Sequence, residues 1–138
     1  FTDSTAGAQS AAAFVDQGAD VVFGAAGDTG TGATRTATAM GAWVIGVDQD
    51  EYYTTFAGGA QPGAHLLSTS AIKRVDLGVF LTIAAMGTGG VEGGGLLLDA
   101  ANGGVTYAPQ HDADVPDETV KALEQIRLAL ASGDLADG

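Results

Sequence analysis

The sequence predicts an α/β fold with a mainly parallel sheet. Helix-forming and strand-forming segments alternate along the chain, and glycine or polar residues follow the apolar runs. This alternation is typical of parallel sheets, in which helices connect strands that run in the same direction. The length favours a single domain, because a chain of 138 residues can bury roughly two thirds of its unfolded surface.

The first half of the chain carries the clearest alternation. Asp3 or Ser4 can cap a helix that runs to about Asp16, and Gln17-Gly18 can end it. The elements expected next are a strand at residues 20–24, a glycine-rich loop at 25–32, a helix of small residues to about Met40, and a strand at 42–47.

The second half is less regular. Residues 49–63 are turn-rich and are expected to form a loop. A helix over Val75–Met86 is apolar on nearly every side, which predicts burial on more than one face. An amphipathic helix is expected between Asp114 and Gly133. Short strands are expected at 65–70, 96–99 and 104–107, the last two joined by a hairpin turn at Asn102-Gly103.

Composition excludes several classes of function. Five basic residues against seventeen acidic ones give a net charge of −12, which would repel nucleic acid and anionic membrane surfaces. The chain has no cysteine, so disulfides, thiolate metal sites and cysteine nucleophiles are excluded. No apolar run approaches the roughly 20 residues of a spanning helix. The first residues read as the interior of a longer polypeptide, and a removed leader stays open.

Asp48 stands where the apolar run Trp43–Val47 stops, a position at which open α/β sheets bind ligands. An ionised carboxylate there accepts two hydrogen bonds, and the vicinal hydroxyls of a ribose supply two donors. The alternative is that Asp48 only fixes the turn or caps residues 49–51.

Two further segments allow a functional and a structural interpretation. The loop Gly27–Gly32 could receive an anion or a neutral ligand, or it could be only a tight turn; Asp28 and the lack of a following lysine disfavour phosphate. Lys73 and Arg74 precede the apolar helix beside Asp76. One of these cations could reach a ligand cleft, or they could form an ion pair at the helix start.

No catalytic constellation is apparent. His65 and His111 are far apart in sequence and lack companions at metal-ligand spacing, so structural or surface roles are favoured. No pattern around the serines indicates a nucleophile. The sequence therefore predicts a protein that is not an enzyme and uses no cofactor or metal.

Five segments together resemble one family. They are FTD at residues 1–3, GADVVFGAAGDTGTG at 18–32, WVIGVDQDEY at 43–52, HLLSTSAIKRVD at 65–76 and LLLDAANGGVTYAP at 96–109. In this order they resemble the basic membrane protein family, the purine nucleoside receptor A-like substrate-binding lipoproteins of bacterial ABC importers. The resemblance covers essentially the whole chain.

The resemblance implies a doubly wound, periplasmic-binding-protein type I-like lobe. Residues 1–138 would form a single lobe similar to the carboxyl-terminal half of a two-lobed protein, with residues 70–95 similar to the segment that crosses to the first lobe. It also implies site roles. Asp48 would bind ribose hydroxyls, Lys73 would reach the cleft, Phe1 would stack on the base, and the backbone near Gly24 and Gly27 would line the pocket.

The function implied by the resemblance is solute binding for import without catalysis. The ligand would be a nucleoside, with a purine base favoured, or a similar polar small molecule, and the partner would be an ABC permease. Members of the family are periplasmic or extracellular and anchored as lipoproteins. The alternative is an isolated lobe that binds no solute by itself and pairs with a first-lobe chain or with a second copy. A nucleotide-using enzyme is disfavoured by Asp28, the missing lysine and the charge.

Overall fold

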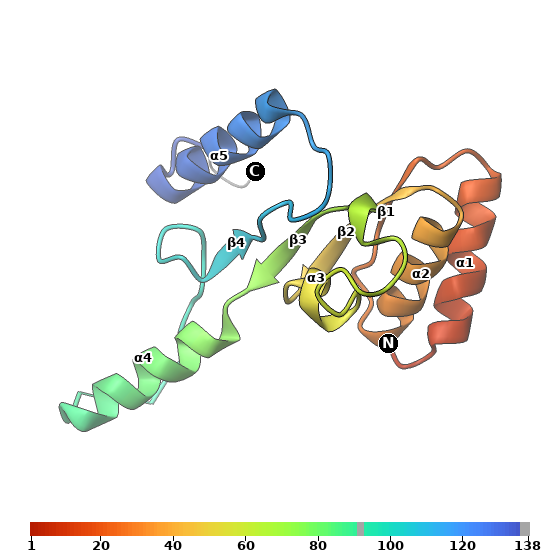
Figure 1. Ribbon diagram of the computed structural model, residues 1–138. Helices are drawn as coiled ribbons and strands as arrows, with labels where there is room; N and C mark the ends of the chain where they lie inside the picture. Colours follow the sequence, from red (N-terminus) through yellow and green to blue (C-terminus); the bar gives the residue numbers. More distant parts are fainter. Residues whose placement is uncertain (91–92, 136–138) are drawn as a thin grey trace. The chain divides into compact units, whose positions relative to one another are not determined.

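The computed structural model describes residues 1–90 and 93–135 and has the predicted α/β architecture. Its strand order is β1-β2-β3-β4 (Figure 1). Both β1/β2 and β2/β3 are parallel pairs, which confirms the mainly parallel sheet. The four strands are β1 (Val21–Phe23), β2 (Trp43–Asp48), β3 (Leu67–Lys73) and β4 (Val105–Tyr107).

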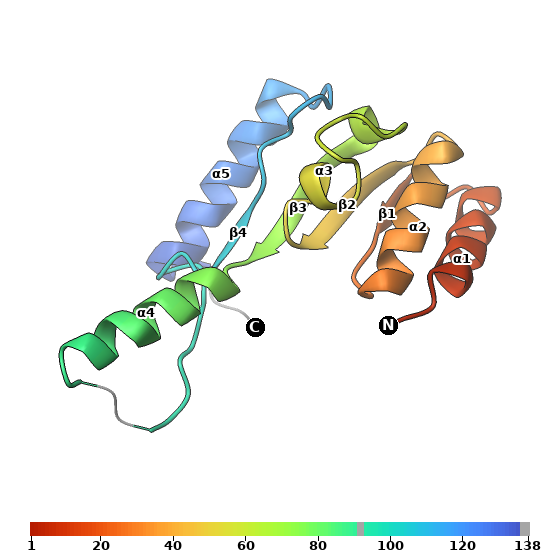
Figure 2. The same cartoon turned by 60° about the horizontal axis from the view of Figure 1, so that its bottom comes forward.

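Helices α1 (Ser4–Asp16) and α2 (Asp28–Ala39) form a layer in which α2 lies next to β1 and β2, and α1 lies on the outer side of α2 (Figures 1 and 2). Asp3 caps α1 as predicted, since its Oδ1 accepts a hydrogen bond from the Ala6 amide at 2.9 Å. The two helices approach closely through glycine. A Cβ on Gly7 would overlap the carbonyl of Thr29, so the backbones themselves are in contact.

The core of this layer is small but fully enclosed. Val44, Ala37 and Phe56 have no exposed surface, and Thr34 is buried with them. The Thr34 hydroxyl is satisfied because it donates to the carbonyl of Gly30 at 2.9 Å. Small residues in α2 therefore bring the helix close to the sheet without leaving a polar group unpaired.

Two expected loops were assigned wrongly. The expected loop at 25–32 ends early, because α2 already begins at Asp28 and includes Gly30 and Gly32. Gly30 is helical because it packs against the backbone of Gly24, where a side chain would clash. The expected loop at 49–63 contains a short helix, α3 (Glu51–Thr54), capped by Asp50, whose Oδ1 accepts from the Tyr52 amide at 3.1 Å. A 3-10 turn, η1 (Ala64–Leu66), precedes β3.

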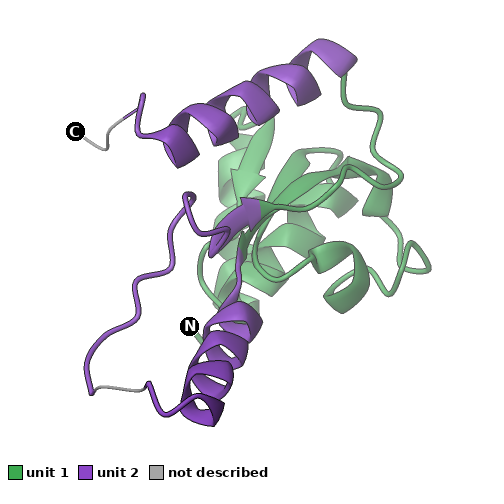
Figure 3. Ribbon diagram, turned by 90° about the vertical axis from the view of Figure 1, so that its left-hand side faces the viewer, with its two compact units in different colours: residues 1–72, 107–116 green, residues 73–106, 117–138 purple. Residues whose placement is uncertain are grey.

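The chain divides into two compact units, shown in different colours in Figure 3. Unit 1 comprises Phe1–Ile72 and Tyr107–Pro116; unit 2 comprises Lys73–Thr106 and Asp117–Gly138. Unit 2 contains α4 (Val75–Gly87) and α5 (Asp117–Ser132). Of the segment 70–95, residues 91–92 lie outside the described part of the chain.

Helix α4 is apolar but has no buried residue, so the described chain does not itself provide the burial predicted for this helix. The expected strand at 96–99 is wrong, and with it the hairpin. The Asn102 side chain closes this segment instead: its Oδ1 accepts from the Asp99 amide at 3.0 Å, and Asp99 Oδ1 accepts from the Asn102 amide at 3.0 Å. Local side-chain bonds thus replace strand pairing here.

None of the helices in residues 1–90 and 93–135 combines the length and the hydropathy that crossing a bilayer requires.

Candidate functional site

A hollow of about 350 Å³ lies in unit 1 where β2 ends and α2 begins. The first turn of α2 forms one wall, and the end of β2 with α3 forms the other. The hollow is polar, as its lining shows: Gly27, Asp28, Thr31, Val47, Asp48, Gln49, Glu51, Thr54 and Thr55.

Asp48 is the last residue of β2, and its side chain is exposed. Its φ of +67° lies in the left-handed region, which is rare for a residue with a side chain. The Gln49 amide donates to the Val47 carbonyl at 2.8 Å across Asp48, which makes a tight three-residue turn. Strained backbone of this kind clusters at functional sites.

Glu51 lies beneath this turn and is only 4% exposed. Its Oε1 accepts from the Val47 amide at 3.1 Å, and its own amide donates to the buried hydroxyl of Ser70 at 3.1 Å. Gly46 makes room for this arrangement, since a Cβ there would lie 2.9 Å from the Cβ and Cγ of Glu51. Sequence reasoning missed Glu51; a glycine inside the buried strand was the available signal.

Burial raises the pKa of the Glu51 carboxyl, although the Val47 amide, the Thr55 side chain and the charge of Arg35 act in the opposite direction. The nearby charge of Asp48 raises it further. The Oε2 atom of Glu51 is buried and forms no hydrogen bond with any of the described residues. The site therefore holds an acid in an environment that favours its neutral form.

We expect this raised pKa to make stability depend on pH. The folded protein binds the Glu51 proton more tightly than the unfolded chain, so the free energy of unfolding should fall as pH rises from about 4.5, the ordinary value, through the folded pKa. Glu51→Gln should remove this fall, and its advantage over the wild type should grow with pH. Urea unfolding between pH 4 and pH 8 measures it. Glu118→Gln, at an exposed position of α5, is the control; a constant difference for Glu51→Gln would contradict the expectation.

A second cluster connects α3 and its capping residue Asp50 to the residues that follow β4. His111 Nε2 lies 2.8 Å from Asp50 Oδ2, and the imidazole stacks on the Tyr52 ring at 4.1 Å. The Tyr52 hydroxyl donates to Asp112 at 2.9 Å, a bond that raises the pKa of Tyr52. His111 thus has the structural environment that its sequence context favoured.

The residues predicted for the site are partly brought together. Gly27 and Asp48 line the same hollow. The carbonyl of Phe1 accepts from the Asp28 amide at 3.0 Å, and Phe1 lies against Gly27 while the residue as a whole is 87% exposed. Gly24 contacts Gly30 and Thr34, which gives it a packing role. Lys73 belongs to unit 2, where it lines an apolar hollow beside α4.

For Arg74, the predicted ion pair at the start of α4 is present. Arg74 forms an ion pair with Asp76 at 2.8 Å in unit 2. The bond to Arg74 lowers the pKa of Asp76. Because both side chains are exposed, this pair contributes little to stability.

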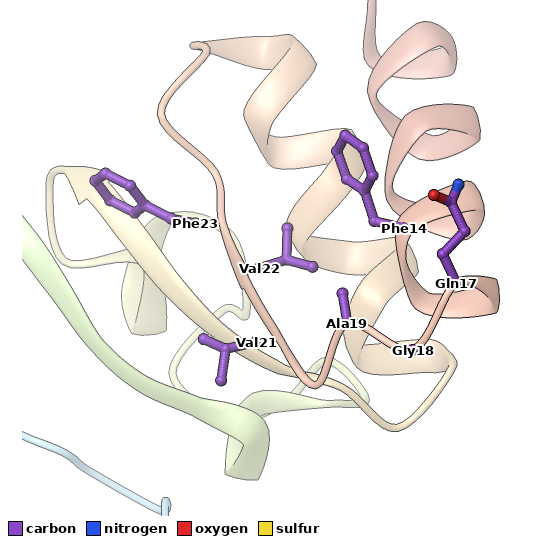
Figure 4. Close-up of a pocket in the computed structure, with 7 residues that line it drawn as sticks. All are labelled: Phe14, Gln17, Gly18, Ala19, Val21, Val22 and Phe23. Carbon is purple, nitrogen blue, oxygen red and sulfur yellow. The ribbon is translucent and has the colours of Figure 1, made fainter.

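A different hollow of unit 1 lies between the end of α1 and the edge strand β1 (Figure 4). Phe14, Val21 and Phe23 line it and are about half exposed. Gln17, its only polar side chain among the lining residues, donates to the Ala13 carbonyl at 2.9 Å. This hollow therefore lacks the converging polar groups of a solute site. Across residues 1–90 and 93–135, no three His, Asp or Glu side chains are grouped to hold a metal ion.

Solved structures share this fold. The chain superimposes with a TM-score of 0.80 on a transcriptional activator of the comK gene from Bacillus halodurans, at 20% identity, covering 97% of this chain and 44% of that one. A solute-binding protein of an ABC transporter system from Conexibacter woesei gives a TM-score of 0.74 at 24% identity, covering 100% and 43%.

Two sequence relatives of the chain are bacterial proteins, one of them a nucleoside-binding protein of an ABC transporter. The ABC transporter nucleoside-binding protein BmpA of Lactococcus lactis is 33% identical over 138 residues, which cover 91% of this chain and 39% of that protein. The CD4+ T-cell-stimulating antigen of Listeria monocytogenes is 28% identical over 145 residues, covering 98% and 40%. The chain thus spans about two fifths of the length of these relatives. The sequence model for PnrA-like ABC transporter substrate-binding proteins matches residues 1–130, so the chain belongs to this family, Bmp, as its motifs predicted.

Proposed function

We propose that this chain supplies one wall of the solute-binding site of an ABC importer, and that the solute is a nucleoside bound without catalysis, with a purine base favoured. The observation that carries the proposal is the position of Asp48: a strained, exposed carboxylate on the rim of a polar hollow, opposite the start of α2. The family of the chain and the nucleoside-binding name of its Lactococcus relative support the same conclusion.

In this proposal the Asp48 carboxylate accepts hydrogen bonds from the two ribose hydroxyls. Gly27 lines the hollow at the start of α2, and Phe1, which lies against Gly27, stacks on the base. Gly24 contributes by holding α2 close to the sheet. Lys73 is included as a donor to the ligand only because the segment around it resembles the family.

The proposal extends to the assembled protein. Since the chain spans about 40% of its relatives, we propose that a first lobe supplies the other wall and that the complete receptor delivers solute to an ABC permease. Its place would be periplasmic or extracellular, with a lipoprotein anchor. The strongly acidic chain, with its net charge of −12, fits a neutral solute better than a polyanion.

Calorimetric titration of the 138-residue chain with adenosine, guanosine, inosine and uridine tests the proposal. We expect saturable binding of nucleosides, weaker binding of their 2′,3′-dideoxy forms, and no binding of the free bases at similar concentrations, because the ribose hydroxyls face Asp48. Equal affinity for nucleosides and dideoxynucleosides would remove Asp48 from the site. No binding of any nucleoside would favour the alternative function.

That alternative is a lobe that binds no solute by itself and pairs with a second copy or a separate first-lobe chain. The observation in its favour is α4, whose apolar side chains Val79, Phe80, Ile83 and Met86 are 55–65% exposed. Apolar surface of this kind is rarely left in water on a soluble monomer.

A further inference from the structure

Asp48, the proposed ligand residue, has a left-handed backbone conformation that an aspartate tolerates but does not adopt by itself. A φ of +67° closes the tight turn from the Val47 carbonyl to the Gln49 amide. Such turns are strained, and they persist only where neighbouring contacts hold them. The question is which contacts do so.

Two hydrogen bonds of the buried residue Glu51 reach the neighbourhood of this turn, one from its side chain and one from its backbone amide. Glu51 Oε1 accepts from the Val47 amide, the residue just before Asp48, at 3.1 Å. The Glu51 amide donates to Ser70 Oγ at 3.1 Å, and Ser70 is fully buried on the adjacent strand. Glu51 therefore connects Val47, the first residue of the turn, with the neighbouring strand β3.

The space around Glu51 is shaped for this connection. Ser70 pairs in register with Gly46, and a side chain on Gly46 would meet both the Ser70 hydroxyl at 2.5 Å and the Glu51 stem at 2.9 Å. A carboxyl group that is 4% exposed is expensive to bury unless its oxygens are used. One oxygen is used by the turn, which gives the acid a reason to be there.

We infer that Glu51 is the positioning residue of the candidate site: it holds the Val47–Gln49 turn so that Asp48 projects its carboxylate from the rim of the hollow. The effect of Glu51 on ligand binding rests on the proposed function, whereas its role in holding the turn rests on geometry alone. Glu51 itself need not touch the solute. An acceptor at its Oε1 position is what the turn requires, so glutamine should serve as well as glutamate.

Amide hydrogen exchange, followed by NMR on the full 138-residue chain without ligand, tests the structural part. In Glu51→Ala we expect exchange at the Val47 and Gln49 amides to accelerate at least about tenfold while the Val44 amide of the same strand stays protected. Glu51→Gln should retain the wild-type pattern. Ser70→Ala should show an intermediate loss. Equal acceleration at Val44 and Val47 in Glu51→Ala, or protection that Glu51→Gln fails to restore, would overturn the inference.

Titration of the same variants with guanosine and adenosine tests the binding part. Glu51→Ala should weaken binding about 10- to 100-fold, and Glu51→Gln should stay within about threefold of the wild type. Unchanged affinity in Glu51→Ala despite a loosened turn would overturn the positioning role. If the wild type binds neither nucleoside, the proposed function fails, and the exchange pattern still decides whether Glu51 holds the turn.

Discussion

Asp48→Ala is expected to weaken nucleoside binding by about 2–4 kcal/mol, which is roughly 30- to 1,000-fold in Kd. Two charge-assisted hydrogen bonds disappear, and the ribose hydroxyls are left without acceptors. Part of the loss comes from the backbone, because the φ of +67° at residue 48 suits Asp, Asn and Gly better than Ala. Calorimetry with the nucleoside that binds most tightly measures the change.

Two companion variants separate these causes. Asp48→Asn keeps a side chain that tolerates the left-handed conformation but removes the charge. Its affinity should therefore lie between that of the wild type and that of Asp48→Ala. Asp50→Ala, two residues away, removes the α3 cap and the contact to His111, and it should cost much less affinity. Equal losses at positions 48 and 50, or no loss at 48, would identify Asp48 as a turn residue only.

The chain, purified alone at micromolar concentration, is expected to self-associate through α4. Phe80 is 65% exposed, Ile83 63% and Met86 64%, and Leu97 in the same unit is 74% exposed. Since burying apolar surface contributes about 25 cal/mol per Å², pairing of such faces offsets the entropy lost on association. Sedimentation equilibrium should therefore show dimers or larger species.

Charged substitutions on α4 give this expectation a control. Phe80→Glu combined with Ile83→Asp should shift the chain towards monomer, while Thr5→Asp, which adds a charge at an exposed position of α1, should leave the distribution unchanged. A well-folded monomer that does not bind a hydrophobic dye would contradict the expectation, and it would mean that α4 folds back onto the sheet of its own chain.

The first half of the fold was predictable because its signals are local. The Asp3 cap, the stop at Gln17-Gly18 and the apolar strand ending at Asp48 act over a few residues, and each is found in the structure. The hollow shared by Gly27 and Asp48 follows from the same reasoning, since the carboxyl ends of parallel strands share one edge of a sheet.

What was mispredicted depends on contacts between distant residues. Gly30 and Gly32 suggested a loop, yet their lack of side chains lets α2 pack against Gly24 and Ser4, so packing outweighs their low helix propensity. The apolar composition of α4 suggested burial, which depends on what covers it. Glu51 was overlooked because an acid after a strand usually faces water; its burial against Ser70 is set by the strand register, which the sequence does not display.

The glycine inside β2 has an evolutionary consequence. A side chain at Gly46 would collide with Glu51 and with Ser70, so none of the three positions can change size independently. Among homologues, a larger residue at position 46 should be accompanied by shorter residues at 51 and 70, and the three should covary as a set. Redesign of ligand preference around residue 48 is limited in the same way. Residues on the rim of the hollow can be exchanged, whereas those beneath it, at positions 46, 51 and 70, must change together.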